Sequence, residues 1–120
     1  DTSYLTNLGQ QLLAQGPSLV IITRGALGAL LMTRKHTVLV MSAPQQVLDT
    51  TGAGDAFMGA ILCRLLQRGW AAGTRLAALN TPELQELGEF ANKTAGISCT
   101  RYGGVASLPY LLEVEKRPSL

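Results

Sequence analysis

Apolar and polar positions alternate in blocks that divide the chain into candidate helices and strands. Leucines recur at helical spacing between positions 5 and 13, after Thr2 or Ser3 as a capping residue. Gly16 and Pro17 follow, which is a typical stop signal for a helix. The opening segment is therefore predicted to be an amphipathic helix.

Short β-branched runs come next. Residues 18–23 form a continuous apolar run, which predicts a strand buried on both faces, as in parallel sheets flanked by helices. The run leads into a glycine-bearing loop at 24–28. Residues 29–33 and 37–41 predict an antiparallel hairpin with its turn at 34–36, and residues 46–48 predict a further short strand.

Two longer helices are predicted in the second half of the chain. The first runs from Gly54 or Asp55 to Arg68 and is closed by Gly69. Its predicted apolar side consists of Phe57, Ile61, Leu62, Leu65 and Leu66. The second begins at 81–83 with threonine as the cap and proline at the first position, and a last short helix is expected at 107–114.

This order of elements predicts an α/β fold with a mostly parallel sheet flanked by helices. In such folds, ligands bind beyond the carboxyl ends of the strands. The glycine-bearing segments 24–28 and 50–54 both follow predicted strands. We therefore expect them to line one crevice.

Composition adds an expectation about partners. The 120 residues suffice for one small domain, and 47% of them are hydrophobic while only 15% are charged. So few charges suggest a missing partner surface, either the rest of a longer chain or a second subunit such as a homodimer. An ordinary small apolar domain explains the composition equally well. Because Asp1 leads directly into a helical pattern, we expect the sequence to begin within a longer protein.

Several function classes fit the sequence poorly. The net charge is +2, basic residues are scattered and aromatics make up 5%, so we expect no nucleic-acid partner. No apolar run reaches membrane-spanning length, so we expect no membrane partner. Cys63 and Cys99 lack the spacing of a zinc site and are expected to be buried apolar residues in a cytoplasmic protein.

The most informative string is Asp-Thr-Thr-Gly-Ala-Gly-Asp at 49–55. Gly52 and Gly54 let the backbone turn sharply and approach a ligand, and the first amides of the following helix form an anion site. Asp55 has two readings: it stabilises the helix N-terminus, or it is a base that accepts a proton from an alcohol. The string lacks the Lys-Ser/Thr of a Walker loop and the third glycine of a dinucleotide fingerprint.

The string at 49–59 resembles the C-terminal signature of the ribokinase-like (PfkB-type) carbohydrate kinases. Residues 20–29 resemble the strand and TxGxxGA segment of that family. Residues 90–95, 100–104 and 108–109 resemble its last helix, glycine loop and closing proline. The resemblance implies that residues 1–120 are the C-terminal nucleotide-binding portion of a ribokinase-like fold, without the N-terminal sugar-binding part and lid.

The resemblance also assigns roles. It makes Asp55 the catalytic base that deprotonates the sugar hydroxyl. The backbone amides that would form the anion hole with it are those of Gly52, Ala53 and Gly54. The residues that would surround ATP are Thr23, Gly25, Gly28 and Asn92. Thr23 also reads as a strand end, and Asn92 as a solvated helix residue.

Many members of this family bind a monovalent cation, usually potassium, beside the anion hole. The matching ligands are Asp49, Thr51, Ser98, Arg101, Gly103 and Ser107. Arg101 would contribute its backbone carbonyl, because a guanidinium cannot ligate a cation. Two of these have a second reading: Asp49 pins the 50–54 turn through its side chain, and Ser107 is a helix cap.

The resemblance implies ATP-dependent phosphorylation of a sugar hydroxyl, with Mg²⁺ on the phosphates. The extended link at 79–87 resembles fructokinases more than ribokinases, while ribose, 2-keto-3-deoxygluconate and nucleosides stay open as substrates. Without the N-terminal part, we expect the chain alone to be inactive. The alternatives are a non-catalytic nucleotide-binding module, which would gain little from Asp55, and an interaction domain, which leaves the three-part pattern unexplained.

Overall fold

The structure is a computed structural model that describes residues 2–42, 53–99 and 114–115. The described elements are α1 (Ser3–Leu13), β1 (Val20–Thr23), the short 3₁₀ helix η1 (Gly25–Leu27), β2 (Ala29–Met32), β3 (Thr37–Val40), α2 (Ala53–Arg68), α3 (Gly73–Ala77) and α4 (Thr81–Cys99). The α/β class and the order of elements expected from the sequence are confirmed for these ranges. The predicted strand at 46–48 lies outside them.

The described strands form one antiparallel sheet in the order β1-β2-β3. Val20 lies opposite Met32, and Ala29 lies opposite Val40. The predicted antiparallel hairpin of β2 and β3 is confirmed. The parallel sheet expected for the strand at 18–23 is not found among the described strands, because a short connection reverses the chain between β1 and β2 and pairs them antiparallel.

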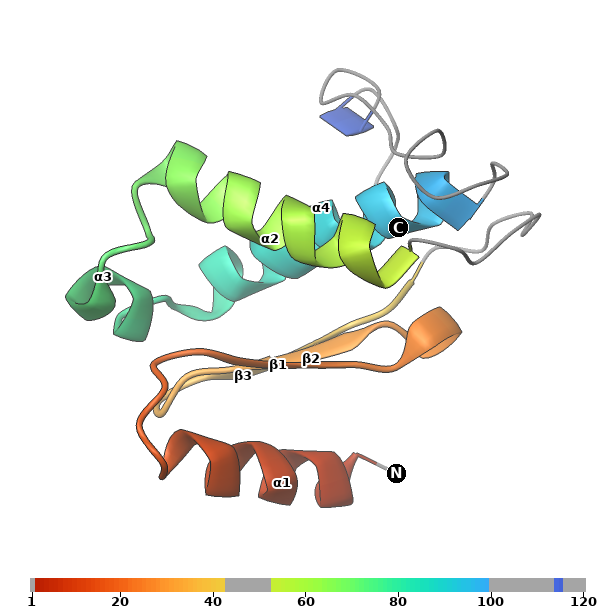
Figure 1. The fold of residues 1–120 in the computed structure, drawn as a ribbon. Coiled ribbons are helices and arrows are strands. Elements are labelled where there is room, and N and C mark those ends of the chain that lie inside the picture. The colour runs from red at the N-terminus through yellow and green to blue at the C-terminus, as the bar shows by residue number, and fades with distance from the viewer. Residues whose placement is uncertain (1, 43–52, 100–113, 116–120) are drawn as a thin grey trace.

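The sheet lies between two helical layers (Figure 1). α1 covers one face and packs on β1 and β2. α4 covers the other face and packs on β2 and β3, while α2 lies along α4. β1 and β3 run in the same direction, since both are antiparallel to β2. Their C-terminal ends lie on the same side of the molecule as the start of α2 (Figure 1).

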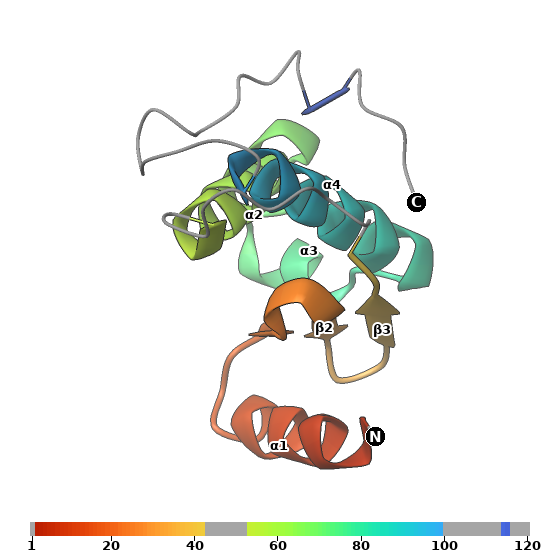
Figure 2. The ribbon, with the colours of Figure 1, turned by 90° about the vertical axis from the view of Figure 1, so that its right-hand side faces the viewer.

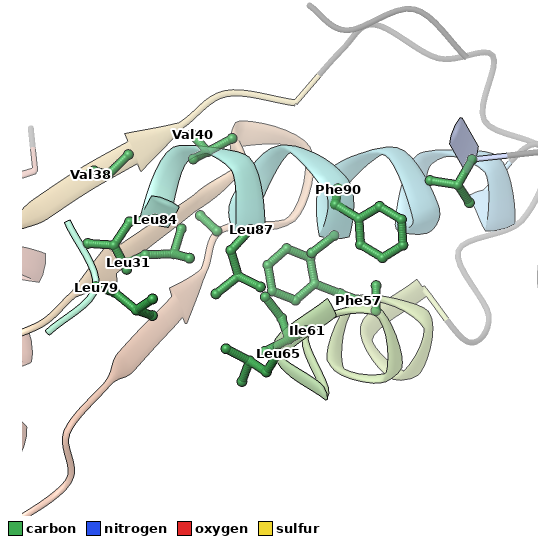
Figure 3. Packing of buried hydrophobic residues seen from close by; sticks show 14 of the residues in the cluster. Leu31, Val38, Val40, Phe57, Ile61, Leu65, Leu79, Leu84, Leu87 and Phe90 are labelled. Carbon is green, nitrogen blue, oxygen red and sulfur yellow. The ribbon is translucent and has the colours of Figure 1, made fainter. Parts of the chain in front are cut away.

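The main core fills the space between the sheet and the α2–α4 pair (Figure 3). Its side chains come from both helices and from the sheet: Leu31, Val38, Val40, Phe57, Ile61, Leu65, Leu79, Leu84, Leu87 and Phe90. A smaller cluster under α1 contains Leu13, Val20, Leu30 and Met32. Buried apolar area on both sides of the sheet is the main source of stability.

β2, and not β1, is the strand buried on both faces. All four residues of β2 are buried, and they alternate between the α1 side and the α4 side. In β1, Ile21 and Ile22 are only half-buried and Thr23 is exposed. The prediction for residues 18–23 is wrong in this respect because β1 is an edge strand of the described sheet.

Close contacts between elements depend on glycine at two positions. A Cβ on Gly88 of α4 would lie 2.5 Å from Val40 Cγ2 and 2.9 Å from Leu31 Cδ1. A Cβ on Gly9 of α1 would lie 2.1 Å from Met32 Sδ. Both helices therefore approach the sheet more closely than any larger residue would permit.

Helix ends follow the sequence signals with one correction. Gly69 has φ +72° and ends α2, as predicted. The cap of α4 is Asn80 and not Thr81. Its side-chain Oδ1 accepts the Glu83 amide at 2.9 Å, and the Glu83 carboxylate accepts the Asn80 amide at 3.0 Å. This reciprocal pair is a capping box with asparagine at the cap position.

Some predicted burial is wrong in the described structure. Leu62 and Leu66 are 55% and 72% exposed, although both belong to the predicted apolar side of α2. Cys63 is exposed and not buried. The helix turns 100° per residue, so this group lies beyond the arc that faces α4. The side chain of Cys99 is outside the described set.

Sequence analysis did not anticipate the buried charge on α2. Arg64 is 8% exposed, and its guanidinium lies 3.8 Å from the centre of the Phe90 ring. Arg64 Nε lies 3.4 Å from the Glu86 carboxylate, and Arg64 Nη1 lies 3.9 Å from that of Glu115. Arg64 thereby connects α2 to α4 and to the described residues near the C-terminus. None of the described helices has the length and apolar content needed to cross a bilayer.

Replacing Gly88 with valine should destabilise the fold by about 1–3 kcal/mol, because the added atoms overlap Val40 and Leu31 in a filled core. Chemical unfolding in urea measures this loss. Gly73→Val is the matched control. Gly73 begins α3 and a Cβ there meets no described atom within 4 Å, so the same substitution should change stability by less than about 0.5 kcal/mol. Equal effects of the two substitutions would contradict the close packing.

Glu83 should make stability depend on pH. Hydrogen bonds from Arg75 and then from the Asn80 amide lower the pKa of Glu83. The stabilisation is therefore complete above the ordinary glutamate pKa of about 4.3 and is lost as pH falls through the lowered value. Glu83→Gln should cost about 0.5–1 kcal/mol at pH 7 and almost nothing at pH 2, measured by urea unfolding.

Glu89→Gln is the control for this measurement, since Glu89 lies on the same helix and forms no ion pair with another described residue. It should have little effect on stability at pH 7, where the Glu83→Gln deficit is expected. A Glu83→Gln deficit that persists unchanged at pH 2 would show that the charge of the carboxylate is not what stabilises the start of α4.

Candidate functional site

Two glycine-bearing segments lie at the same end of the molecule. β1 and β3 both end there, η1 follows β1, and α2 begins there (Figure 1). Figure 2 views the molecule from this end, with η1 toward the viewer and the first turn of α2 above it. The described residues of segments 24–28 and 50–54 therefore lie at the same end of the molecule, and the crevice expected between them stays a prediction.

The first segment is a tight turn built on two glycines. Gly25 has φ +56° and Gly28 has φ +95°, a region that favours glycine. The Arg24 amide donates to the Gly28 carbonyl at 2.7 Å and closes the turn. A Cβ on Gly28 would lie 1.9 Å from the Val40 carbonyl oxygen. The structure thus explains Gly28 through its approach to β3.

Gly25 has a different environment. It is exposed, and a Cβ there would meet no described atom within 4 Å. Thr23 is also exposed, at the end of β1. The two residues present backbone and hydroxyl groups to solvent beside η1, where a ligand can reach them.

The second segment is the first turn of α2, with Ala53, Gly54 and Asp55. Gly54 and Asp55 are both exposed. A Cβ on Gly54 would meet no described atom within 4 Å, and its φ is not positive. No described neighbour therefore requires glycine at this position. The first amides of a helix lack intrahelical partners and attract anions, so close approach of an anion is a physical reason for glycine here.

Asn92 joins α4 to the end of β3. Its Nδ2 donates toward the carbonyls of Val40 and Met41, each at 3.4 Å. The amide group is half-buried and holds the strand end in place. Asn92 is therefore not a freely solvated helix residue, and a contact to adenine stays a prediction.

Two residues of this region were not anticipated from the sequence. Leu27 in η1 and Met41 after β3 are 55% and 52% exposed. A Cβ on Gly28 would lie 3.0 Å from the Met41 Cα, and Leu27 precedes Gly28 in the chain. Both apolar residues therefore belong to chain segments that adjoin Gly28. The sequence signal was present: an apolar residue within a glycine loop, and another at a strand end.

Several predicted ligands cannot be placed. Gly52 of the anion hole and most of the predicted cation ligands lie outside the described residues, namely Asp49, Thr51, Arg101, Gly103 and Ser107. Ser98 lies in the last turn of α4, and its side chain is also outside the described set. In the parts of the chain that are described, no three His, Cys, Asp or Glu side chains gather as a metal ion would require.

The described hollows lie elsewhere, beside the turn between β2 and β3. One, of about 460 Å³, is lined by Ser18, Arg34, Lys35, His36, Thr74, Ala77 and Ala78. His36 is half-buried, with Nδ1 3.4 Å from the Thr81 hydroxyl. Arg34 donates to the Leu13 carbonyl at 2.8 Å and so caps α1. This end of the molecule is opposite the glycine segments (Figure 1).

Comparison with known sequences shows which proteins this chain resembles. A family model described as pfkB family carbohydrate kinase matches residues 1–111. Fructokinase-1 of Oryza sativa subsp. japonica is 37% identical over 98 residues, which are 82% of this chain and 28% of that protein. Fructokinase of Vibrio alginolyticus is 30% identical over 115 residues, which are 95% of this chain and 35% of that protein.

Solved structures with a similar fold are also carbohydrate kinases. A fructokinase with bound ATP from Xylella fastidiosa superposes with a TM-score of 0.82 at 28% identity, over 95% of this chain and 37% of that one. An E. coli ribokinase II in complex with ATP and Mg²⁺ gives 0.71 at 31% identity, over 88% and 30%. A Vibrio cholerae fructokinase double mutant bound to fructose, ADP and potassium gives 0.72 at 30% identity, over 91% and 33%.

The chain thus spans between 28% and 37% of the length of these relatives. The match extends over the two glycine segments and the helices that carry them. It confirms the ribokinase-like fold class predicted from the sequence. The chain belongs to the pfkB family of carbohydrate kinases.

Proposed function

We propose that these residues form the nucleotide-binding and base-bearing part of an ATP-dependent sugar kinase, with fructose as the first candidate substrate. The observation that carries the proposal is the first turn of α2, where Gly54 and the Asp55 carboxylate are both exposed. An anion site and a carboxylate at one helix start are poorly matched for binding alone, because the carboxylate repels phosphate. They are well matched for transfer.

In the proposed reaction, the sugar hydroxyl gives its proton to the Asp55 carboxylate. The hydroxyl oxygen then bonds to the γ-phosphorus, the bond from that phosphorus to the bridging oxygen breaks, and ADP leaves. Backbone amides of residues 52–55 would stabilise the charge on the transferring group.

ATP would lie across the end of the sheet. Thr23 and Gly25 would face its phosphates or ribose, and the exposed Leu27 and Met41 offer apolar surface for the base. Asn92 keeps the end of β3, and with it Met41, in position. In this proposal, Gly28 contributes through the shape of the turn.

The described residues fit Mg²⁺ only as an ion carried by the nucleotide phosphates, because Asp55 is the one acidic side chain among the described site residues. Mg²⁺ bound in that way would neutralise phosphate charge. The potassium ligands predicted at 49, 51, 98, 101, 103 and 107 remain a prediction. A cytoplasmic setting agrees with the exposed free thiol of Cys63.

Fructose is favoured over ribose because the relatives that match with high coverage include several fructokinases. The sugar pocket itself would come from the part of such a kinase that these 120 residues do not contain. The chain by itself should therefore bind ATP weakly and phosphorylate no sugar.

Asp55→Asn should abolish turnover while preserving nucleotide binding. The assay uses a chimera in which this chain replaces the matched 115 residues of Vibrio alginolyticus fructokinase. Loss of the base should lower kcat with fructose and ATP by at least about 100-fold. Dissociation constants for ATP, measured by calorimetry, should change less than threefold because the carboxylate is not a nucleotide ligand in this mechanism.

The control is Asp55→Glu, which keeps a carboxylate at the same helix start and should retain more activity than the amide. Turnover by Asp55→Asn within tenfold of the parent chimera would remove Asp55 from the base role. ATP binding without turnover in the parent chimera would favour the non-catalytic module. Sugar phosphorylation by the 120-residue chain alone would contradict the need for the remaining part.

A further inference from the structure

The turn between β2 and β3 carries three consecutive basic residues, Arg34, Lys35 and His36, which together are called the basic turn below. The Thr33 amide donates to the His36 carbonyl at 2.9 Å and closes a two-residue loop. Such loops favour glycine, asparagine or aspartate. Arg34 and Lys35 occupy the loop against this local preference, and positions that break a local rule are often functional.

Other elements hold two of these side chains in place. Arg34 Nη2 donates to the Leu13 carbonyl at the end of α1 at 2.8 Å. His36 Nδ1 lies 3.4 Å from the Thr81 hydroxyl at the start of α4. These contacts use one N–H group of the guanidinium and one nitrogen of the imidazole, so each side chain keeps further polar groups for a ligand. Because the side chains are already fixed, binding would cost little conformational entropy.

The basic turn borders the hollow of about 460 Å³ that lies beside α3. The other walls of this hollow are the polar residues Ser18 and Thr74 and the small residues Ala77 and Ala78. Its volume is within the range of about 300–1,000 Å³ that is usual for small-molecule sites. A second hollow of about 420 Å³, toward α1, borders the same three basic residues. The basic turn therefore stands between two spaces that a ligand can enter.

Within the described part of the chain, no acidic residue pairs with the basic turn. Neither hollow is lined by aspartate or glutamate. The sequence itself has no acidic residue between positions 2 and 48. Glu83, near the start of α4, is already paired with Arg75. The positive charge of the basic turn is therefore left for an anion from outside.

We propose that the basic turn and the hollow beside α3 form a binding site for a small phosphate ester of the size of a sugar phosphate. The guanidinium of Arg34 presents a planar set of donors that matches phosphate oxygens, and Lys35 adds a point charge. The hydroxyl groups of Ser18 and Thr74 would bind hydroxyl groups of the organic part.

This site is separate from the site of the proposed reaction. The basic turn lies at the end of the molecule opposite η1 and the start of α2 (Figure 1). An ester bound there is too far from Asp55 to be the reacting group. The hollow is bordered by the segment before β1, by the β2–β3 turn and by α3, so a bound ester would join three elements and stabilise their arrangement.

The test is a titration of the isotope-labelled 120-residue chain with fructose 6-phosphate, followed through the amide chemical shifts. Amide signals of residues 33–37 and 74–78 should move together, with one binding constant. Signals of residues 24–28 and 53–55 report separately on the end that carries Asp55. Fructose without phosphate should leave the signals of the basic turn unchanged, because the phosphate supplies the charge that the site recognises.

Lys35→Gln should weaken binding of fructose 6-phosphate about tenfold or more, since it removes a charged hydrogen bond to phosphate. It should leave urea unfolding unchanged, because Lys35 is exposed and its side chain has no described partner. Lys93→Gln is the matched control. It removes the same charge from α4, where the lysine also forms no ion pair with a described residue, and should change the binding constant less than twofold.

Shift changes at the basic turn that Lys35→Gln removes and Lys93→Gln retains support the site. Changes confined to residues 24–28 and 53–55 overturn it, and so do equal changes with fructose. Inorganic phosphate that binds as tightly as the ester would show that the hydroxyl-lined hollow takes no part in recognition, which overturns the assignment to an organic ester.

If the chain alone gives no resolved spectrum, the same variants are compared in the Vibrio alginolyticus chimera described above. Fructose 6-phosphate should raise its melting temperature. Lys35→Gln should reduce that rise by at least half, and Lys93→Gln should leave it unchanged. Equal rises in both variants overturn the site.

Binding at the basic turn and phosphoryl transfer can fail separately. A chimera that phosphorylates no sugar, but whose basic turn binds the ester, retains this site and refutes the proposed function. A chimera that phosphorylates fructose, and whose basic turn ignores the ester, does the reverse. Asp55→Asn should leave the titration of the basic turn unchanged, because the two sites lie at opposite ends of the molecule.

Discussion

The close packing of α4 on the β2–β3 hairpin is the constraint on which the rest of the structure depends. It is possible because Gly88 has no side chain, so that the helix backbone can approach Val40 and Leu31. α4 in turn is the surface on which α2 packs, through the leucine and phenylalanine core. The position of Asp55 at the start of α2 is thus set by a contact made far from it. Asn92 then fastens α4 to the end of β3, beside η1.

The sequence predicted most elements because their signals are local. Leucine spacing, Gly69 and the run after residue 81 each identify a helix or its end within a few residues. The strand environments were predicted less well. A continuous apolar run such as residues 18–23 reads as buried on both faces, yet burial depends on which strand becomes the neighbour. β2, between two partners, is the strand that is fully buried.

The sequence suggests a candidate site through its backbone chemistry but does not reveal the side-chain contacts around it. Glycines that precede a helix are visible in one sequence, and so is an acid at the first turn. The exposed Leu27 and Met41 depend on how η1 lies beside the end of β3, and no spacing rule reports that. Arg64 was overlooked for the same reason: its place over Phe90 requires the packing of two helices that are distant in sequence.

The few charges of this chain now have a structural explanation. Most charged residues of α2, α3 and α4 form ion pairs with one another. Arg64 and Arg68 pair with Glu86, and Arg75 pairs with Glu83. The outer face of α2 is left with apolar side chains between its two charged ends. The exposed apolar side chains of this face would gain free energy only when covered.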